Sequence, residues 1–478
     1  MTQKNEIPAL ILALGTTLLL LGGGYWWLTR HTELGRNLSQ SIPQAIPETS
    51  PNTAPNRPGQ SPLEQRFSAG ERLLIAGVAS AEKQAGISAI AAGDFTQAVS
   101  ALEASLQQNR NDPEALVYLN NARIGSGQNY TLAVAVPTTT SVDPAQEILR
   151  GVAQAQQQVN ESGGINGVPI RILIVNDDNA PAVAAQVAET LVQDPTVLGV
   201  VGHFGSETSL AAGEVYQRGG LVMVSPTSTA VGLSGFGDAI FRTVPSDRFT
   251  ATTLSRYLVN SLQERNVAIY FNADSDYSQS LKNELTTALL SDGGQVVAEI
   301  NVAEPSFNAR GSLDQASQQG AEVLVLATNT STLNQALQVV EANQARLPLL
   351  GGDSLYNPQL LQRGGADAAD MVVTVPWILL SNPNTPFVAT ARQLWGGDVN
   401  WRTAMAYDAV LAIAAGLAPN PSRSGLQATL SGAGFTTEGA TGTIRFLPSG
   451  DRNQAMQLVQ VRPGTRSGYG YDFVPVQP

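Results

Sequence analysis

The stretch VLGVVGHFGSETSLAAGEVYQRGGLVMVSP, residues 197–226, contains two short apolar runs on either side of a helical pattern. The first run stops at Gly202 and opens into a loop of small, hydroxyl-bearing and acidic residues, and the second run stops at Ser225 and Pro226. Short strands that alternate with helices of roughly ten to fifteen residues form βαβ units with a parallel sheet. The stretch therefore predicts an α/β fold in which a buried strand ends in a loop that contains Gly and Ser.

The same alternation runs from residue 129 to about residue 376 and forms two blocks of similar size. In the first block we expect strands at 130–137, 168–177, 197–202 and 221–226, and helices at 144–161, 181–193 and 207–218. In the second block we expect helices at 248–263, 278–291, 311–319 and 332–343, with apolar strands between and after them. Two such blocks favour two Rossmann-like lobes, and open α/β sheets bind ligands outside the carboxyl ends of their strands.

The composition excludes several classes of function. With 27 Lys and Arg against 39 Asp and Glu, the 478-residue chain has a formal net charge of −12, which argues against nucleic acid as a partner. The chain has no cysteine, so disulfides, thiolate nucleophiles, zinc–sulfur sites and a lipid-modified cysteine are excluded. Its two histidines, His31 and His203, lie in different segments and form no metal-binding spacing. We expect neither a metal nor a cofactor.

The N-terminal segment, residues 1–36, contains one apolar run of membrane length. No charged residue occurs at positions 7–29, and at about 1.5 Å per residue this run can cross about 30 Å of hydrocarbon. The Tyr-Trp-Trp sequence at 25–27 suits a membrane interface and favours a retained transmembrane helix that anchors the chain. Lys4 before the run and the glycines at 22–24 leave an uncleaved or cleaved signal peptide as the alternative.

Two further segments precede the first strand. Residues 37–69 are rich in Pro, Ser, Asn and Thr, and they predict a disordered tether because they have too little apolar surface to offset ordering entropy. Residues 70–125 become Ala-rich with helical periodicity and resemble a tetratricopeptide repeat. One complete copy is visible, whereas a solenoid usually needs about three, so we expect a helical hairpin that packs on its neighbour. The residues that carry this likeness are Gly93, Asp94, Phe95, Ala98, Leu102 and Pro113.

From about residue 129 to residue 478, the chain resembles the type I periplasmic binding proteins of the branched-chain amino acid transport class. Each motif that carries the resemblance is weak alone, but the series in the family's order is specific. The motifs are GGINGVPI at 163–170, DD at 177–178, VVGHFGS at 200–206, GLVMVSPTST at 220–229, FRTVPSD at 241–247 and GGDSLYN at 351–357.

The resemblance implies a bilobed solute-binding domain with a three-segment hinge. Lobe one would comprise about 129–246 and 377–447, and lobe two about 247–376 and 448–478. The crossings would lie near Pro245, Pro376 and Pro448. A ligand bound between the lobes would draw them together.

The resemblance also implies that a ligand carboxylate binds at the loops that end the third and fourth strands. Ser206 matches the family's carboxylate-binding serine, Thr229 matches its second hydroxyl, and Gly205 permits close approach to a helix N-terminus, whose N–H groups and dipole favour an anion. Thr227 lies where a backbone carbonyl helps to hold an ammonium group, and Ser228 belongs to the same loop. N-capping of helices by these hydroxyls is the alternative.

Residues of the second lobe would complete the implied site. Asp353 matches the family's acidic residue that binds the ligand ammonium through a charge-assisted hydrogen bond, with a solvated capping Asp as the alternative. Tyr277 lies where the family has a tyrosine that closes over the ligand, and Thr328 lies at a strand end that usually lines the cleft. Phe204 replaces a smaller aliphatic wall residue, and the family's tyrosine is absent from TTTSVDP at 138–144, so the resemblance does not fix a branched-chain ligand.

Three other features have structural explanations. His203 has no nucleophile motif of the GxSxG kind near it, so we expect a loop histidine held by local hydrogen bonds. Asp177 and Asp178 are adjacent on an extended strand and point to opposite faces, which predicts a strand-end turn and not a metal pair. GVVGHFG at 199–205 is not the GxGxxG fingerprint of a dinucleotide site.

The chain is not expected to be an enzyme, because its sequence does not assemble a nucleophile, a base and an electrophile. We expect a monomeric, membrane-tethered receptor on the extracytoplasmic side that binds an amino acid or a similar small zwitterion and delivers it to the membrane subunits of an ABC-type permease. One alternative is a sensory receptor of the same fold for an amino acid, an amide or urea, which signals through the helical hairpin. Another is an interaction protein with a vestigial cleft.

Overall fold

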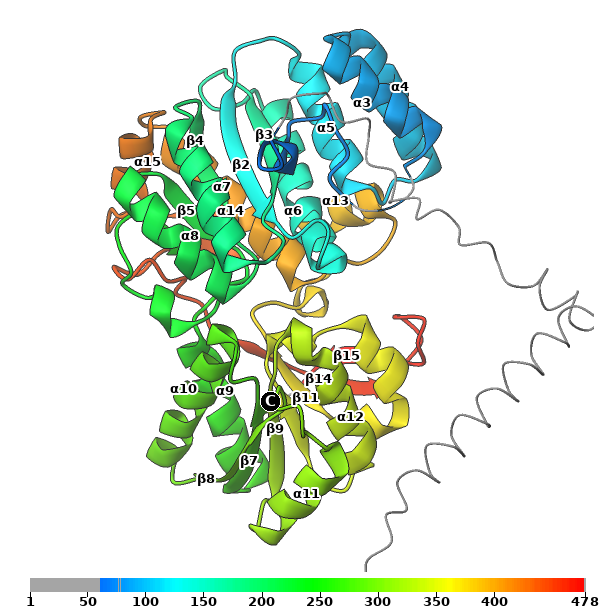
Figure 1. Ribbon diagram of the computed structural model, residues 1–478, viewed down its shortest axis with the longest axis vertical. Coiled ribbons are helices and arrows are strands. Elements are labelled where there is room, and N and C mark those ends of the chain that lie inside the picture. Colours follow the sequence, from blue (N-terminus) through cyan, green and yellow to red (C-terminus); the bar gives the residue numbers. More distant parts are fainter. Residues whose placement is uncertain (1–60, 76, 78, 477–478) are drawn as a thin grey trace, which may run out of the picture. The chain divides into compact units, whose positions relative to one another are not determined.

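The computed structural model describes residues 61–75, 77 and 79–476, which all lie in one compact unit (Figure 1). The predicted membrane anchor and most of the predicted tether lie outside the described residues. Within the described part of the chain, no helix is long and apolar enough to span a membrane. The described chain folds into two lobes, each built around one largely parallel sheet.

The sheet of lobe one has the strand order β1-β3-β2-β4-β5-β6. Its strands are β1 (Phe67–Ser68), β2 (Tyr130–Val136), β3 (Ile170–Asn176), β4 (Val197–Val201), β5 (Val222–Ser225) and β6 (Ile240–Arg242). All pairs are parallel except β1 with β3. Residues 132–136 of β2 are fully buried, as expected for a parallel strand with helices on both faces. The carboxyl ends of the strands therefore meet at one edge of the sheet.

Helices cover the sheet of lobe one, and one helix pair packs very closely. The helices are α6 (Val142–Glu161), α7 (Pro181–Gln193), α8 (Ser206–Gly219), α13 (Pro386–Trp395), α14 (Trp401–Leu417) and α15 (Arg423–Leu430). Helix α14 runs against α6. A Cβ atom at Gly151 of α6 would lie 2.1 Å from the carbonyl oxygen of Thr403, so this crossing requires glycine. The small hairpin of β12 (Thr437–Gly439) and β13 (Gly442–Ile444) follows α15.

The N-terminal helices α3 (Ala81–Ala92), α4 (Phe95–Gln108) and α5 (Pro113–Ile124) pack on one another and, through α5, on α6 and β3. Asp94 and Asp112 cap α4 and α5 by accepting hydrogen bonds from backbone N–H groups. Lys83 forms a buried ion pair with Glu114 at 2.8 Å. The region expected to form a hairpin thus forms a run of three helices against lobe one.

The boundary of the predicted tether needs correction. Glu64–Arg66 form a 3-10 turn and Phe67–Ser68 form β1, so the folded lobe begins before residue 69. Arg66 pairs with Asp178 at 2.5 Å. The composition could not show this, because a two-residue strand is too short to produce an alternating pattern.

The outer edge of β3 is covered by backbone and side-chain groups in turn. Strand β1 pairs with residues 174–175. The side-chain amide of Asn121 accepts from the Ile172 N–H at 3.0 Å and donates to the Ile172 carbonyl at 2.7 Å. Asn160 does the same at Ile170, at 2.8 and 3.0 Å. Each amide thus replaces one peptide group of a neighbouring strand.

The sheet of lobe two has the order β15-β14-β11-β10-β9-β7-β8, with β14 and β15 antiparallel to their neighbours. Its strands are β7 (Asn266–Phe271), β8 (Gln295–Asn301), β9 (Val323–Ala327), β10 (Leu349–Gly351), β11 (Val372–Val375), β14 (Gln457–Pro463) and β15 (Tyr471–Pro475). Its helices are α9 (Asp247–Arg256), α10 (Asp276–Asp292), α11 (Ala309–Gln318) and α12 (Leu333–Asn343). The helix expected at 248–263 changes after Arg256 into a π-helical turn, Tyr257–Leu262.

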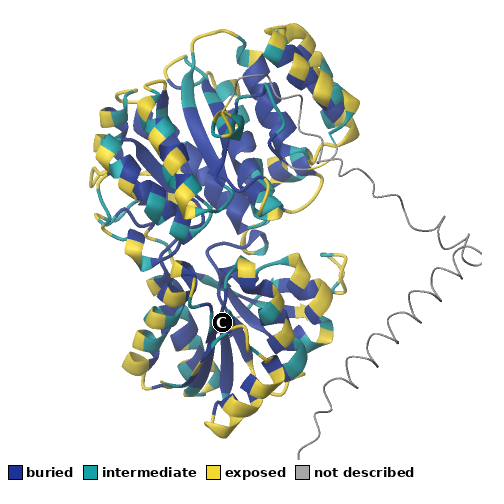
Figure 2. Cartoon of the chain, in the orientation of Figure 1, coloured by how far each residue is buried: buried dark blue, intermediate teal, exposed yellow. Residues whose placement is uncertain are grey.

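The chain passes between the lobes after β6, after β11 and before β14. The first and third crossings are bonded to each other. Arg242 and Asp451 form a buried ion pair at 2.6 Å, and the Arg242 N–H donates to the Gly450 carbonyl at 3.0 Å. Figure 2 shows that the strands of both sheets are buried, whereas the outer faces of the helices are exposed.

Candidate ligand-binding cleft

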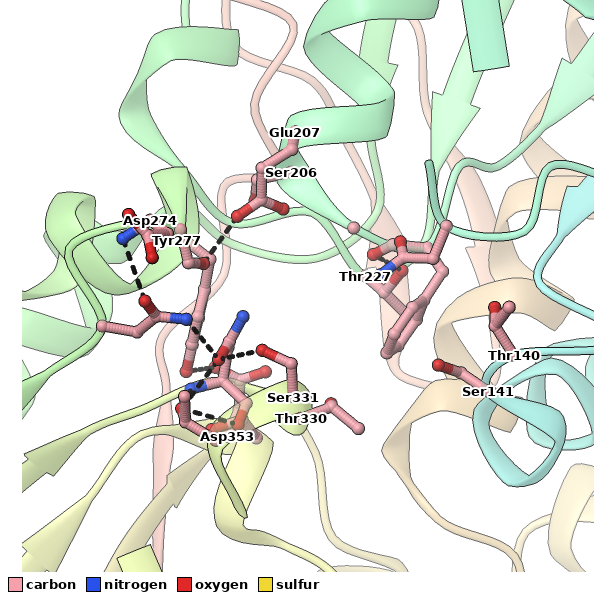
Figure 3. Close-up of a pocket in the computed structure, with 18 of the residues that line it drawn as sticks. Thr140, Ser141, Ser206, Glu207, Thr227, Asp274, Tyr277, Thr330, Ser331 and Asp353 are labelled. Carbon is pink, nitrogen blue, oxygen red and sulfur yellow. Dashed lines mark hydrogen bonds between the residues drawn. The ribbon is translucent and has the colours of Figure 1, made fainter. Parts of the chain in front are cut away.

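A cavity of about 740 Å³ lies between the lobes, at the carboxyl ends of the strands of both sheets (Figure 3). This volume is within the range of small-molecule sites. Of the residues expected at the ligand site, those that line the cavity are Phe204, Gly205, Ser206, Thr227, Tyr277 and Asp353. Those that do not line it are Ser228, Thr229 and Thr328.

The wall of lobe one is built on the N-terminus of α8. Gly205 is the N-cap residue, with an extended backbone and no side-chain cap, so the first N–H groups of the helix are not capped by a side chain. Ser206 is the first helical residue, is buried, and accepts a hydrogen bond from the Ala230 N–H at 3.3 Å. A Cβ atom at Gly205 would lie 2.5 Å from Oδ1 of Asn179. This end of α8 can therefore receive an anionic group.

The hydroxyls of the loop after β5 hold the loop after β4 in place. Ser225 donates to the His203 carbonyl at 3.0 Å, Thr227 to the Phe204 carbonyl at 2.8 Å and Ser228 to the Gly205 carbonyl at 3.0 Å. Ser228 therefore supports the wall from behind and does not face the cavity. Thr227 lines the cavity while its hydroxyl is already bonded.

His203 is part of a buried hydrogen-bonded group, as expected from the sequence. Its Nδ1 lies 2.7 Å from a carboxylate oxygen of Asp177, and its Nε2 lies 3.1 Å from the Tyr216 hydroxyl. All three side chains are buried. His203 thus fixes the loop after β4 to β3 and α8.

Asp177 and Asp178 point in different directions, as the strand geometry predicted. Asp177 bonds to His203 and accepts from the Asn179 N–H at 2.9 Å, whereas Asp178 pairs with Arg66 and accepts from the Thr139 hydroxyl. Among the described residues, no group of three or more metal-ligating side chains occurs. The pair forms a strand-end turn.

The wall of lobe two contains a buried carboxyl. Asp353 begins the 3-10 turn after β10 and is 4% exposed. The Tyr277 hydroxyl, from the first turn of α10, donates to Oδ1 of Asp353 at 2.9 Å. Burial raises the pKa of Asp353, and Arg402 and Tyr277 offset only part of this effect. Burial also raises the pKa of Tyr277 well above its usual range, so its hydroxyl remains a donor.

Thr328 lies behind the wall of lobe two. It is fully buried, and its carbonyl accepts from the Ser354 hydroxyl at 2.5 Å. The next residues, 329–332, line the cavity in its place. Sequence analysis missed this Asn-Thr-Ser-Thr segment, although hydroxyls directly after a strand are the same signal that marked the loop after β5.

A second buried acid, Asp247, lies behind the cavity at the start of α9. It is fully buried, and its N–H donates to the Thr229 carbonyl at 2.9 Å. Burial raises the pKa of Asp247 to about 7, more than the hydroxyls of Ser280 and Thr229 lower it. Thr229, expected to touch the ligand, thus lies next to Asp247 instead.

Sequence analysis also missed Trp401 and Arg402, the first residues of α14, which line the cavity. The Arg402 guanidinium lies over the Trp401 ring, 4.4 Å from its centre. These residues come from the second passage of the chain through lobe one, and no local pattern marks them. Their position in the cleft follows from tertiary structure alone.

The lobes touch at the cleft in this structure. The Ser275 hydroxyl of lobe two donates to Glu207 of lobe one at 2.5 Å, and the Ser280 hydroxyl accepts from the Val231 N–H at 3.0 Å. Figure 3 shows the Glu207 contact at the edge of the pocket. A ligand in the cavity would contact both lobes.

A family model described as periplasmic binding protein matches residues 130–467. The chain is similar to an amino acid binding protein of Pseudomonas aeruginosa, with 34% identity over 202 residues, which are 40% of this chain and 52% of that relative. The match thus spans about half the length of that protein. The chain is also similar to the leucine-, isoleucine-, valine-, threonine-, and alanine-binding protein of the same species, with 25% identity over 67% of this chain and 86% of the relative.

Solved structures show the same fold. A leucine binding protein from Thermotoga maritima superimposes with a TM-score of 0.64 and 20% identity, over 73% of this chain and 99% of that one. The matched family region begins at β2 and ends between β14 and β15. The helices α3 to α5 lie outside it.

Proposed function

Because the chain belongs to the periplasmic binding protein family, we propose that it is the substrate-binding component of an ABC transporter and captures an amino acid or a similar small zwitterion between its lobes. Proteins of this family bind and do not convert their ligands, in agreement with the expectation from the sequence. In this proposal the N-terminal segment tethers the protein to the outer face of the membrane, and the loaded protein delivers its ligand to the membrane subunits of the transporter.

The observation that carries the proposal is the arrangement of two complementary charges across one cavity. The uncapped N-terminus of α8, with Ser206, offers N–H donors on the wall of lobe one. Asp353 offers a buried carboxyl on the wall of lobe two, with one oxygen bonded to Tyr277. A carboxylate at the first and an ammonium at the second would join the lobes and bring Asp353 into its ionised form.

Binding calorimetry of the full-length chain in detergent tests this proposal, with the natural amino acids, urea and benzoate as ligands. At least one amino acid should bind, and Asp353→Asn should weaken its affinity by roughly 10- to 100-fold, because a hydrogen bond to a charged group is lost.

Asp370→Asn is the matched control, since Asp370 is an exposed acid on a surface ion pair with Arg462. This variant should bind like the unmodified protein. Binding of benzoate but of no amino acid would contradict the ammonium site while leaving the fold assignment intact.

A further inference from the structure

Arg402 is a buried cation in the cavity without an acidic partner. It is 5% exposed, and among the residues that the structure describes no carboxylate forms an ion pair with it. Its Nη1 donates to the Tyr356 carbonyl at 3.5 Å, the long limit of a hydrogen bond, and its buried Nε has no hydrogen-bond partner in the described structure. A buried charge in this state is costly unless a ligand compensates it.

Neighbouring residues fix the position of Arg402. Its guanidinium lies over the Trp401 ring, which is a favourable cation–π arrangement. Its N–H donates to the capping side chain of Asn400 at 2.8 Å, so the residue begins the 17-residue helix α14. The helix dipole adds positive potential at the same place. Arg402 is thus held in position before any ligand arrives.

The acids nearest to Arg402 have other partners. Burial lowers the pKa of Arg402, and Asp353 and Glu147 act against this effect through their charges. Glu147 pairs with Arg150 at 2.9 Å and accepts from the Thr403 hydroxyl at 2.5 Å. In the proposed function, Asp353 is neutralised by the ligand ammonium. A bound zwitterion would therefore leave Arg402 without a counter-charge.

The remaining acids of the cavity wall do not cancel this charge. Asp178 is paired with Arg66, Glu207 accepts from Ser275, and Asp274 is exposed to solvent. Water weakens the field of exposed charges, whereas buried charges interact strongly. Asp353 and Arg402 are the buried charges among the residues that line the cavity.

We propose that Arg402 binds a second acidic group of the ligand, so that the cavity selects amino acids with an acidic side chain over those with a neutral or branched aliphatic one. This inference rests on the proposed function. The ligand would place one carboxylate at the N-terminus of α8, its ammonium at Asp353 and its other carboxylate at Arg402. A guanidinium can hold a carboxylate through two parallel hydrogen bonds, which an amide or an alkyl group cannot accept equally well.

Calorimetry of the full-length chain in detergent with L-glutamate, L-glutamine, L-leucine and glutarate tests the inference. The unmodified protein should bind glutamate at least tenfold more tightly than the nearly isosteric glutamine. Arg402→Met should weaken glutamate binding by roughly 10- to 100-fold and change glutamine binding less than threefold. Arg402→Lys, which keeps the charge, should retain part of the preference. Arg363→Gln, at an exposed ion pair with Glu341, is the control and should leave all affinities unchanged.

Each contrary result has a separate meaning. If glutamine or leucine binds the unmodified protein as tightly as glutamate, the inference is wrong while the proposed function stands. If Arg402→Met weakens all amino acids equally, Arg402 holds a group common to them, and the inference is again wrong. Binding of glutarate as tight as that of glutamate would keep the role of Arg402 and contradict the ammonium site at Asp353. If none of the natural amino acids binds, the proposed function fails, and the inference with it.

Discussion

The loop after β4 and the turn after β10 both follow the carboxyl end of a buried strand and both line the cavity, but their polar groups are satisfied very differently. In the loop after β4, His203 is bonded through both ring nitrogens, and the carbonyls of residues 203–205 accept from Ser and Thr hydroxyls of the next loop. In the turn after β10, Asp353 receives one side-chain hydrogen bond, from Tyr277. The first region is a completed scaffold, and the second leaves bonding capacity for a ligand.

The largest expected effect concerns Asp247, a poorly compensated acid behind the cavity. Because its folded pKa of about 7 exceeds an unfolded value of about 3.9, the folded state binds its proton more tightly. The free energy of unfolding should therefore fall as the pH rises from about 4 to 7, by up to about 4 kcal/mol. Urea unfolding at pH 5 and pH 8 should show this loss in the unmodified protein and not in Asp247→Asn. An equal pH dependence in both proteins would contradict the role of Asp247.

The completed scaffold should respond strongly to loss of its central residue. His203→Ala removes two hydrogen bonds and leaves Asp177 buried with fewer partners, so we expect the free energy of unfolding to fall by about 3 kcal/mol. Tyr216→Phe removes only the bond to Nε2 and should cost about 1 kcal/mol. Urea denaturation measures both values. Similar small losses in the two variants would mean that His203 does not fix the loop.

The turn after β10 should show an effect of the opposite sign in the absence of ligand. Because burial raises the pKa of Asp353, its ionised form destabilises the folded state above the unfolded pKa. Asp353→Asn should therefore raise the midpoint of thermal unfolding at pH 8, by about 1 kcal/mol in free energy, while it weakens ligand binding. A loss of stability at pH 8 would indicate that Asp353 belongs to the scaffold and not to the ligand site.

The smallest expected effect is that of the Tyr277 hydroxyl. Since this group helps to lower the pKa of Asp353, Tyr277→Phe should raise that pKa further. Ligand affinity measured by calorimetry should then decline a few-fold at pH 6 and less at pH 8, where Asp353 is more fully ionised. A decline that is equal at both pH values would place the effect of Tyr277 in direct contact with the ligand.

The regular elements could be predicted because their signals are local. The helix expected at 181–193 is α7, Pro181–Gln193, and the helix expected at 207–218 is α8, Ser206–Gly219. An amphipathic period of 3.6 residues and apolar runs bounded by Gly and Pro are sufficient to place such elements. Strand β1 was missed because two residues carry no period.

The cleft could be predicted only in part, because the direction of a side chain in a loop depends on tertiary structure. Thr227, Ser228 and Thr229 are consecutive hydroxyl residues, yet only Thr227 lines the cavity. Asp353 follows a strand end, which is a recognisable position. Arg402 comes from a helix that is buried along most of its length, and the sequence gives no sign that its first turn reaches the cleft.

The coverage of β3 by β1, Asn121 and Asn160 has a consequence for solubility. An open strand edge presents unpaired N–H and C=O groups to any other chain and is a template for aggregation. Here two side-chain amides and one short strand occupy these groups, and two of the three come from residues that precede β2. Loss of residues 61–125 would therefore uncover the edge of β3 at 172–175, and the remaining lobes should self-associate through it even though their ligand cavity is intact.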